Sequence, residues 1–281
     1  MQKSNLNICF IGGDKRQKYA AEKLSNYANI NAVGKCFCNT LGINPFESPM
    51  KAMYRADVIV LPLPAATVED TADFTNIVEY ARNSGALVIG GMFSKYMKDA
   101  MDELNVTYID FYEDEGLTVR NAYITAEGAL NLAMQYLETS IINSRFAVIG
   151  YGRIGSALAD ILKANKGDVT AYARRREALI LAEERGIKGK QISFDDRLEY
   201  DVIFNTVPSR VISNEQILGL GRDTILIELA SAPGGFDFEI AEQSGLKTIK
   251  ASGLPGRYAP VTAGYAVADT ILTILEREAL L

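Results

Sequence analysis

The sequence predicts an α/β protein of two consecutive Rossmann-type domains, each built on a parallel sheet. Runs of β-branched residues alternate with helical patterns, the alternation restarts in the second half, and a glycine-rich loop follows the first strand of that half. A chain of 281 residues is long enough for two domains of ordinary size. We expect a first domain over residues 1–124 and a second domain over residues 125–281.

The expected elements of both domains follow the order of βαβ units. In the first domain we expect strands at 7–11, 57–61, 86–89 and 106–110, and helices at 15–26, 71–83 and 95–104. In the second we expect strands at 145–149, 169–172, 201–205, 224–229 and 247–250, and helices at 154–165, 176–185, 214–220 and 238–244.

Two more helices are expected at the ends of the second domain. Residues 125–142 carry apolar side chains at helical spacing behind Thr125, a residue type that caps helices. We expect this segment to cross between the domains as a linker helix. Residues 263–281 are predicted to form a C-terminal helix that packs back on the first domain.

Composition excludes several functional classes. The net charge is −6 with lysine and arginine scattered along the chain, so nucleic acid and anionic membranes are not expected partners. The absence of histidine removes the Ser-His-Asp arrangement and nearly all zinc ligand sets, and no metal site is expected. Three cysteines and no apolar run of about 20 residues favour a cytoplasmic location.

A glycine-rich loop predicts the cofactor site. Residues 150–155 read Gly-Tyr-Gly-Arg-Ile-Gly between a strand and a helix, which is the context that dinucleotide binding requires. Gly150 permits the turn, Gly152 lets the backbone approach the pyrophosphate, and Gly155 lets the helix pack on the strand. The expected cofactor-binding residues are Gly150, Tyr151, Gly152, Arg153, Ile154, Gly155, Ala173, Arg174, Arg175, Thr206, Val207 and Pro208.

The end of the next strand favours NADP as the cofactor. NAD sites place an acidic residue there, but here Ala173 is followed by three arginines. Guanidinium groups suit the 2′-phosphate of NADP, with Arg174 the first choice and Arg175 the next. The first domain lacks a spaced third glycine, and its Asp14 would repel a pyrophosphate, so we expect it to bind substrate.

Several segments together resemble the A-subunit of dipicolinate synthase from spore-forming bacteria. They are 11–17, 125–128, 150–155, 205–209, 229–235 and 253–264, of which the Ser-x-Pro-Gly-Gly and Gly-Leu-Pro-Gly segments are the most specific. The resemblance spans essentially the whole chain. It implies NADP-dependent oxidation of a dihydrodipicolinate-type intermediate to pyridine-2,6-dicarboxylate, the flavoprotein-like B-subunit of dipicolinate synthase as partner, and a role in the mother cell during sporulation. Ala232 is a departure, since family members can carry arginine there.

The expected substrate is therefore a small dicarboxylate, held by polar groups near the carboxyl ends of the strands. The expected substrate-binding residues are Arg16, Gln17, Ser209, Ser231, Gly234, Arg257 and Thr262. The catalytic candidates are Glu127, Glu228 and Ser231, and Glu127 is expected in the first turn of its helix. For Glu127 a structural role is slightly favoured.

Two alternatives remain open from the sequence. One is a non-catalytic NADP-binding subunit of a larger synthase, which would bind NADP tightly without turnover. The other is a D-2-hydroxyacid-type dehydrogenase, which is disfavoured because those enzymes normally use a histidine and this chain has none. The sequence also leaves the oligomeric state open, and a homo-oligomer is one of the alternatives.

Overall fold

The computed structural model describes residues 4–68 and 72–281 and divides into two compact units. The first unit comprises Met1–Arg120 and Ala259–Leu281, and the second comprises Asn121–Tyr258. Each contains one six-stranded sheet in which every pairing is parallel, which confirms the predicted fold class. Residue 71, the expected start of one helix, lies outside the described residues.

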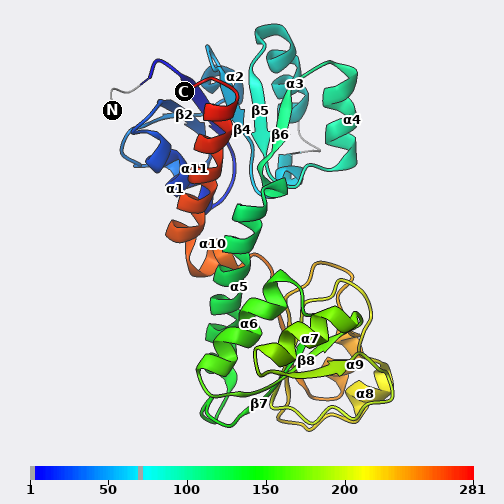
Figure 1. Ribbon diagram of the computed structural model, residues 1–281. Helices are drawn as coiled ribbons and strands as arrows, with labels where there is room; N and C mark the ends of the chain where they lie inside the picture. The colour runs from blue at the N-terminus through cyan, green and yellow to red at the C-terminus, as the bar shows by residue number, and fades with distance from the viewer. Residues whose placement is uncertain (1–3, 69–71) are drawn as a thin grey trace. The chain divides into compact units, whose positions relative to one another are not determined.

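The first sheet has the strand order β3-β2-β1-β4-β5-β6 (Figure 1). Its strands are β1 (Asn7–Ile11), β2 (Asn29–Val33), β3 (Ile43–Phe46), β4 (Val58–Val60), β5 (Leu87–Gly90) and β6 (Tyr108–Asp110). The helices of this unit are α1 (Lys15–Leu24), α2 (Pro49–Ala52), α3 (Ala72–Ser84), α4 (Lys95–Glu103) and α11 (Pro260–Arg277). Both faces of the sheet are buried by apolar clusters, which explains why the central strands are almost wholly apolar.

The second sheet has the order β12-β11-β10-β7-β8-β9. Its strands are β7 (Arg145–Ile149), β8 (Asp168–Ala173), β9 (Lys188–Gln191), β10 (Val202–Asn205), β11 (Ile225–Glu228) and β12 (Lys247–Lys250). Its helices are α6 (Arg153–Ala164), α7 (Arg176–Glu184), α8 (Asn214–Leu218), α9 (Phe238–Gln243) and α10 (Leu254–Tyr258), and α5 (Glu115–Tyr136) enters it from the first unit. The carboxyl ends of β7, β10 and β11 lie side by side in this sheet.

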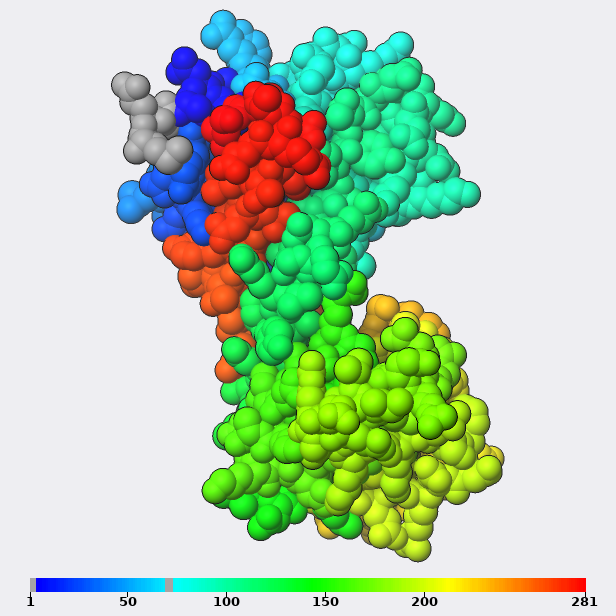
Figure 2. Space-filling view, in the orientation of Figure 1, coloured from blue at the N-terminus to red at the C-terminus, as the bar shows by residue number. Residues whose placement is uncertain are grey.

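The C-terminal helix packs on α1, as predicted. A side chain at Gly264 would bring its Cβ 2.5 Å from the backbone oxygen of Arg16 and 2.7 Å from the Cβ of Tyr19, so the two helices cross in close contact. An ion pair between Lys23 and Asp269 joins them. Figure 2 shows the red surface of α11 directly against the dark-blue segments of the first unit. The helix spans Pro260–Arg277 rather than 263–281, because Pro260 suits the first turn and Ala279 adopts a positive φ of 55°.

The predicted linker helix was placed too late in the sequence. Helix α5 begins ten residues earlier, at Glu115, because the Asp114 carboxylate accepts the Leu117 N–H at 2.7 Å and so caps the first turn. Thr125 is not a cap: it lies inside the helix and its hydroxyl donates to the Asn121 carbonyl at 2.7 Å. The helix ends at Tyr136, and the residues up to 142 form a loop.

Candidate functional site

The glycine loop after β7 has the backbone geometry that its sequence predicts. Gly150 adopts a φ of +94°, and a Cβ there would lie 2.3 Å from the Thr206 hydroxyl. A Cβ at Gly155 would lie 1.9 Å from the carbonyl oxygen of Gly150. Neither position therefore accepts a side chain, since the turn and the first turn of α6 are in direct contact.

Gly152 has a different environment. A Cβ at this position would meet no protein atom within 4 Å, so the backbone faces open space. Gly152 is also the residue preceding α6, and no side chain caps this helix. The helix therefore begins without a side-chain cap, and a helix N-terminus attracts phosphate.

A pocket of about 410 Å³ opens beside this loop, a volume typical of small-molecule sites. It is lined by Gly150, Tyr151, Gly152, Ala173, Arg174, Arg175, Ala178, Ile192 and Val207. Seven of these nine are among the residues expected to bind the cofactor. The other two, Ala178 and Ile192, carry no chemical signal in the sequence and contribute apolar surface to the pocket wall.

Three consecutive arginines, Arg174 to Arg176, are exposed where β8 ends and α7 begins. Within the part of the chain that the structure describes, no carboxylate lies in ion-pair distance of Arg174 or Arg175. Cations at a helix N-terminus are opposed by the helix dipole. This local arrangement is unfavourable for the chain alone, and an anionic ligand would relieve it.

Thr206, Val207 and Pro208 follow β10 at the same edge of the sheet. The Thr206 hydroxyl donates to the carbonyl oxygens of Ile149 at 3.0 Å and Gly150 at 3.2 Å. Thr206 thus stabilises the glycine loop, while Val207 lines the pocket and Pro208 is exposed. Of the other predicted cofactor residues, Arg153 is exposed and Ile154 is half-buried in the first turn of α6.

Glu228, the last residue of β11, is buried and its carboxylate is fully engaged. One oxygen accepts from the Asn205 amide at 2.6 Å and the Ala230 N–H at 2.9 Å, and the other accepts from the Gly235 N–H at 2.8 Å. Burial raises the pKa of Glu228, although these three donors act in the opposite direction. Asn205, with no exposed surface, was not among the predicted site residues.

The remaining predicted residues of the second unit lie on loops and on the helices α5 and α10. Ser209, Ser231 and Arg257 are exposed. Gly234 is buried with a φ of +86°, and its N–H donates to the Ser231 carbonyl at 3.1 Å, so this donor already has a partner. Glu127 is exposed in the middle of α5 and not in its first turn, because the helix begins at Glu115.

Arg16, Gln17 and Thr262 belong to the first unit. The Arg16 guanidinium is bidentate to Asp14 at 2.9–3.1 Å and also donates to the Leu63 carbonyl at 2.6 Å. The Gln17 side chain accepts from the Asp14 N–H at 3.1 Å and completes a capping box. Both residues therefore stabilise the start of α1, and Thr262 is exposed in the first turn of α11.

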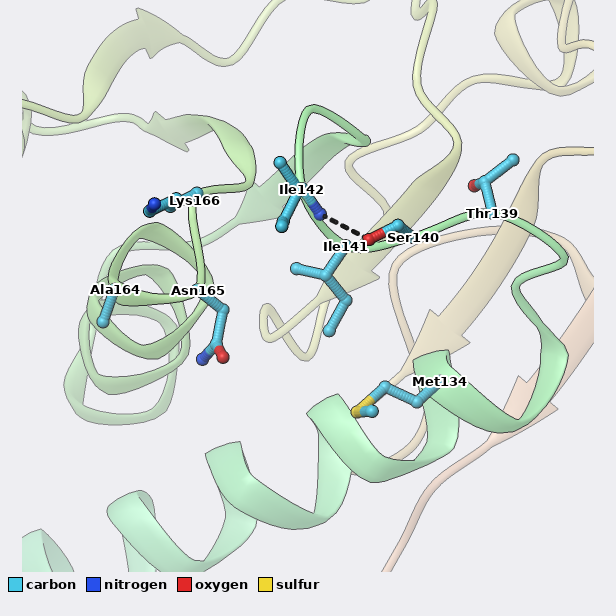
Figure 3. A pocket seen from close by; sticks show the side chains of 8 residues that line it. All are labelled: Met134, Thr139, Ser140, Ile141, Ile142, Ala164, Asn165 and Lys166. Carbon is cyan, nitrogen blue, oxygen red and sulfur yellow. Dashed lines mark hydrogen bonds between the residues drawn. The ribbon is translucent and has the colours of Figure 1, made fainter.

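A second hollow of about 490 Å³ lies at the opposite edge of the second sheet, before β7 and β8 (Figure 3). Its lining residues are Met134, Thr139, Ser140, Ile141, Ile142, Ala164, Asn165 and Lys166. The Ser140 hydroxyl accepts from the Ile142 N–H at 3.3 Å, and Thr139 bonds to Ser144 at 3.2 Å. These polar groups stabilise their own loop, and the hollow contains no acid–base pair.

Two of the three cysteines have thiols that resist ionisation. All three are unpaired, and burial raises the pKa of Cys9 to about 12 and that of Cys36 to about 11. Across residues 4–68 and 72–281, no group of three or more cysteine and acidic side chains is arranged to hold a metal ion. In the same residues no helix has the length and apolar character to cross a membrane.

Each half of the chain matches the model of a known protein family. Residues 7–112 match the model of the N-terminal domain of the dipicolinate synthase A-subunit, and residues 117–233 match that of the D-isomer specific 2-hydroxyacid dehydrogenase NAD binding domain. The second match supports a nucleotide-binding second unit of the dehydrogenase type.

Three matches, from two Bacillus species, cover almost the whole chain. The dipicolinate synthase A-subunit of Bacillus subtilis (strain 168) is 29% identical over 97% of this chain and 96% of its own length. The crystal structure of the corresponding protein from Bacillus halodurans has a TM-score of 0.84, 30% identity, and coverage of 96% of this chain and 97% of that one. The crystal structure of the Bacillus subtilis protein also has a TM-score of 0.84, with 27% identity. It covers 98% of this chain, and 97% of that chain is covered. The chain belongs to the family of dipicolinate synthase A-subunits.

Proposed function

We propose that this chain is an NADP-dependent oxidoreductase that converts a dihydrodipicolinate-type intermediate to dipicolinate. The observation that carries the proposal is the pocket beside Gly152, whose walls include Arg174 and Arg175 and no acidic side chain. Family membership supports the reaction, since the relatives named above are dipicolinate synthases. A role in sporulation and a cytoplasmic setting belong to the same proposal.

The pocket fits a dinucleotide in three respects. Open space over Gly152 leaves room for a pyrophosphate, and the uncapped start of α6 offers N–H donors to it. Arg174 and Arg175 supply guanidinium groups where the adenosine ribose of a Rossmann ligand would carry its 2′-phosphate. When bound, NADP⁺ supplies the acceptor for the hydride that the substrate loses.

The substrate chemistry suits a chain without histidine. Oxidation removes one hydride and one proton from the ring, and the product gains aromatic stabilisation. A strongly tuned base is therefore less necessary, and the main task of the protein is to hold two carboxylates in place. Ser209, Ser231, Gly234 and Arg257 of the second unit are the proposed contacts there.

Arg16, Gln17 and Thr262 are the proposed substrate contacts of the first unit. For Arg16 and Gln17 this requires exchange of a present contact, because Asp14 engages both side chains. Glu127 is the proposed proton acceptor, and Glu228 is the alternative candidate. Glu127 is the more accessible of the two, since three N–H donors surround the Glu228 carboxylate.

The cofactor assignment is tested by titrating the chain with NADPH and NADH and following nucleotide fluorescence. We expect tighter binding of NADPH. Changing Arg174→Ala should weaken NADPH binding roughly 10- to 100-fold, the usual loss for a hydrogen bond to a charged group, and leave NADH binding within about twofold. Arg197→Ala is the matched control, because Arg197 is an exposed arginine paired with Glu199. Tighter binding of NADH would overturn the assignment.

The reaction and the partner are tested together. The purified chain is mixed with NADP⁺ and freshly made intermediate, with and without the B-subunit of dipicolinate synthase, and dipicolinate is followed by its ultraviolet absorbance. We expect product from the chain with NADP⁺. If the chain bound NADP tightly but gave no product both with and without the B-subunit, it would instead be a non-catalytic nucleotide-binding protein.

A further inference from the structure

We infer that Glu228 and Asn205 act together as a positioning pair, which holds the backbone of Val207 in the nucleotide pocket and the neighbouring loop 230–235. The inference rests on the proposed nucleotide site and assigns Glu228 a role other than proton transfer. Two adjacent strands supply the pair, since Asn205 ends β10 and Glu228 is its register partner at the end of β11.

The Asn205 side chain forms hydrogen bonds with both the N–H and the carbonyl group of Val207. Its side-chain oxygen accepts the Val207 N–H at 3.1 Å, and its side-chain nitrogen donates to the Val207 carbonyl at 2.8 Å. The same nitrogen donates to Glu228 at 2.6 Å. The two contacts with Val207 determine which way the amide faces, because a flipped amide would place donor against donor and acceptor against acceptor.

Glu228 then connects Asn205 to the next loop. Its carboxylate accepts the N–H groups of Ala230 and Gly235, and Gly235 in turn accepts at its carbonyl from Val211 at 2.8 Å and Ile212 at 3.0 Å. A Cβ at Gly235 would lie 2.4 Å from the Asn205 amide, so the loop packs directly on the pair. One carboxylate thus organises the segments that follow β10 and β11.

The donor set requires a carboxylate at position 228. All three groups around it are N–H donors, and only an ionised carboxylate accepts from all of them. A glutamine has one acceptor oxygen, so its NH₂ group would face at least one N–H donor in either orientation. An unpartnered buried donor is costly, and the loop is expected to loosen.

The experiment compares the full-length chain with Glu228→Gln and with Asn205→Asp, which disrupt the pair from its two sides. In Asn205→Asp a carboxylate oxygen replaces the amide donor and faces two acceptors, the Glu228 carboxylate and the Val207 carbonyl. Glu239→Gln, an exposed substitution on α9, is the control. Amide hydrogen exchange reports on the loops, and NADPH titration and steady-state kinetics report on the site.

For Glu228→Gln we expect exchange in 206–212 and 230–235 to become at least about tenfold faster, with β7 and β8 unchanged, and NADPH affinity to fall by a similar factor. Asn205→Asp should loosen the same two segments. Unchanged exchange in Glu228→Gln would overturn the inference. So would normal NADPH affinity with turnover lost in Glu228→Gln, which would identify Glu228 as the proton acceptor.

These outcomes separate the inference from the proposed function. If the unaltered chain bound no NADPH, the nucleotide assignment would fail, yet the hydrogen-exchange comparison would still test whether the pair holds the two loops. If it bound NADPH but Glu228→Gln changed neither exchange nor affinity, only the positioning role would fail.

Discussion

At the scale of single residues, glycine stands at three positions of one loop for three different physical reasons. Gly150 needs its positive φ, Gly155 needs to be small against a backbone carbonyl, and Gly152 has free space around it. The motif by itself predicts all three, but only the structure shows that packing within the protein accounts for Gly150 and Gly155 and not for Gly152.

That distinction predicts opposite behaviour for two alanine variants. Gly152→Ala should cost at most about 1 kcal/mol of stability, because its new methyl group meets no protein atom. It should still weaken NADPH binding at least about tenfold, since the methyl group occupies the approach to the α6 N-terminus. Thermal unfolding and NADPH titration measure the two effects.

Gly155→Ala should lower both the thermal stability of the protein and its affinity for NADPH. Its Cβ would overlap the Gly150 carbonyl, and overpacking of this kind costs about 1–3 kcal/mol or more. A Gly152→Ala protein that binds NADPH normally would show that the pyrophosphate does not approach there. A Gly155→Ala protein as stable as the parent would show that the loop is not as tight as described.

At the scale of elements, the sequence predicted nine of the twelve described strands, including the edge strand β12, but missed β2, β3 and β9. Strands β3 and β9 lie at sheet edges and read Ile-Asn-Pro-Phe and Lys-Gly-Lys-Gln. Neither shows the apolar alternation of a half-buried strand, because an edge tolerates polar residues and proline. They are strands only because β2 and β8 offer them backbone partners.

The starting point of α5 changes the expectation for Glu127. An acidic residue in a first turn is stabilised by the helix dipole, but Glu127 lies twelve residues after Glu115, in mid-helix. No capping role explains it, and its exposure leaves it available to a substrate. A loss of turnover on changing Glu127 would therefore report on catalysis and not on a lost helix cap.

We expect Glu127→Gln to leave folding stability within about 0.5 kcal/mol, as for most surface substitutions. If Glu127 accepts the proton, turnover should fall about 100-fold or more while NADPH affinity stays constant. Turnover within about twofold of the parent would remove Glu127 from the mechanism. Glu138→Gln, another exposed glutamate just beyond α5, serves as the control.

At the scale of the whole molecule, the chain leaves its first unit once and returns to it. Residues Ala259–Leu281 belong to the first unit although they follow the second unit in sequence. Helix α11 contributes Ala266, Val267, Ala268, Ile271, Ile274 and Leu275 to the first apolar core. The nucleotide pocket, by contrast, is lined wholly by residues of the second unit.

This division predicts that the nucleotide site survives in isolation. A fragment of residues 121–258 should fold and bind NADPH within about tenfold of the full-length affinity, because it retains its own sheet and core. Circular dichroism and NADPH titration test this, with Arg174→Ala in the same fragment as the control. A folded fragment without affinity would place part of the nucleotide site in the first unit.

The sequence by itself determined the fold class, the position of the glycine loop and the family. These depend on local signals: apolar runs, glycine spacing and a few rare segments. The tertiary structure alone decided that Asn205 and Glu228 meet at 2.6 Å, and that Asp14 engages Arg16 and Gln17. The roles of buried polar residues depend on partners distant in sequence, so the pattern around each residue cannot reveal them.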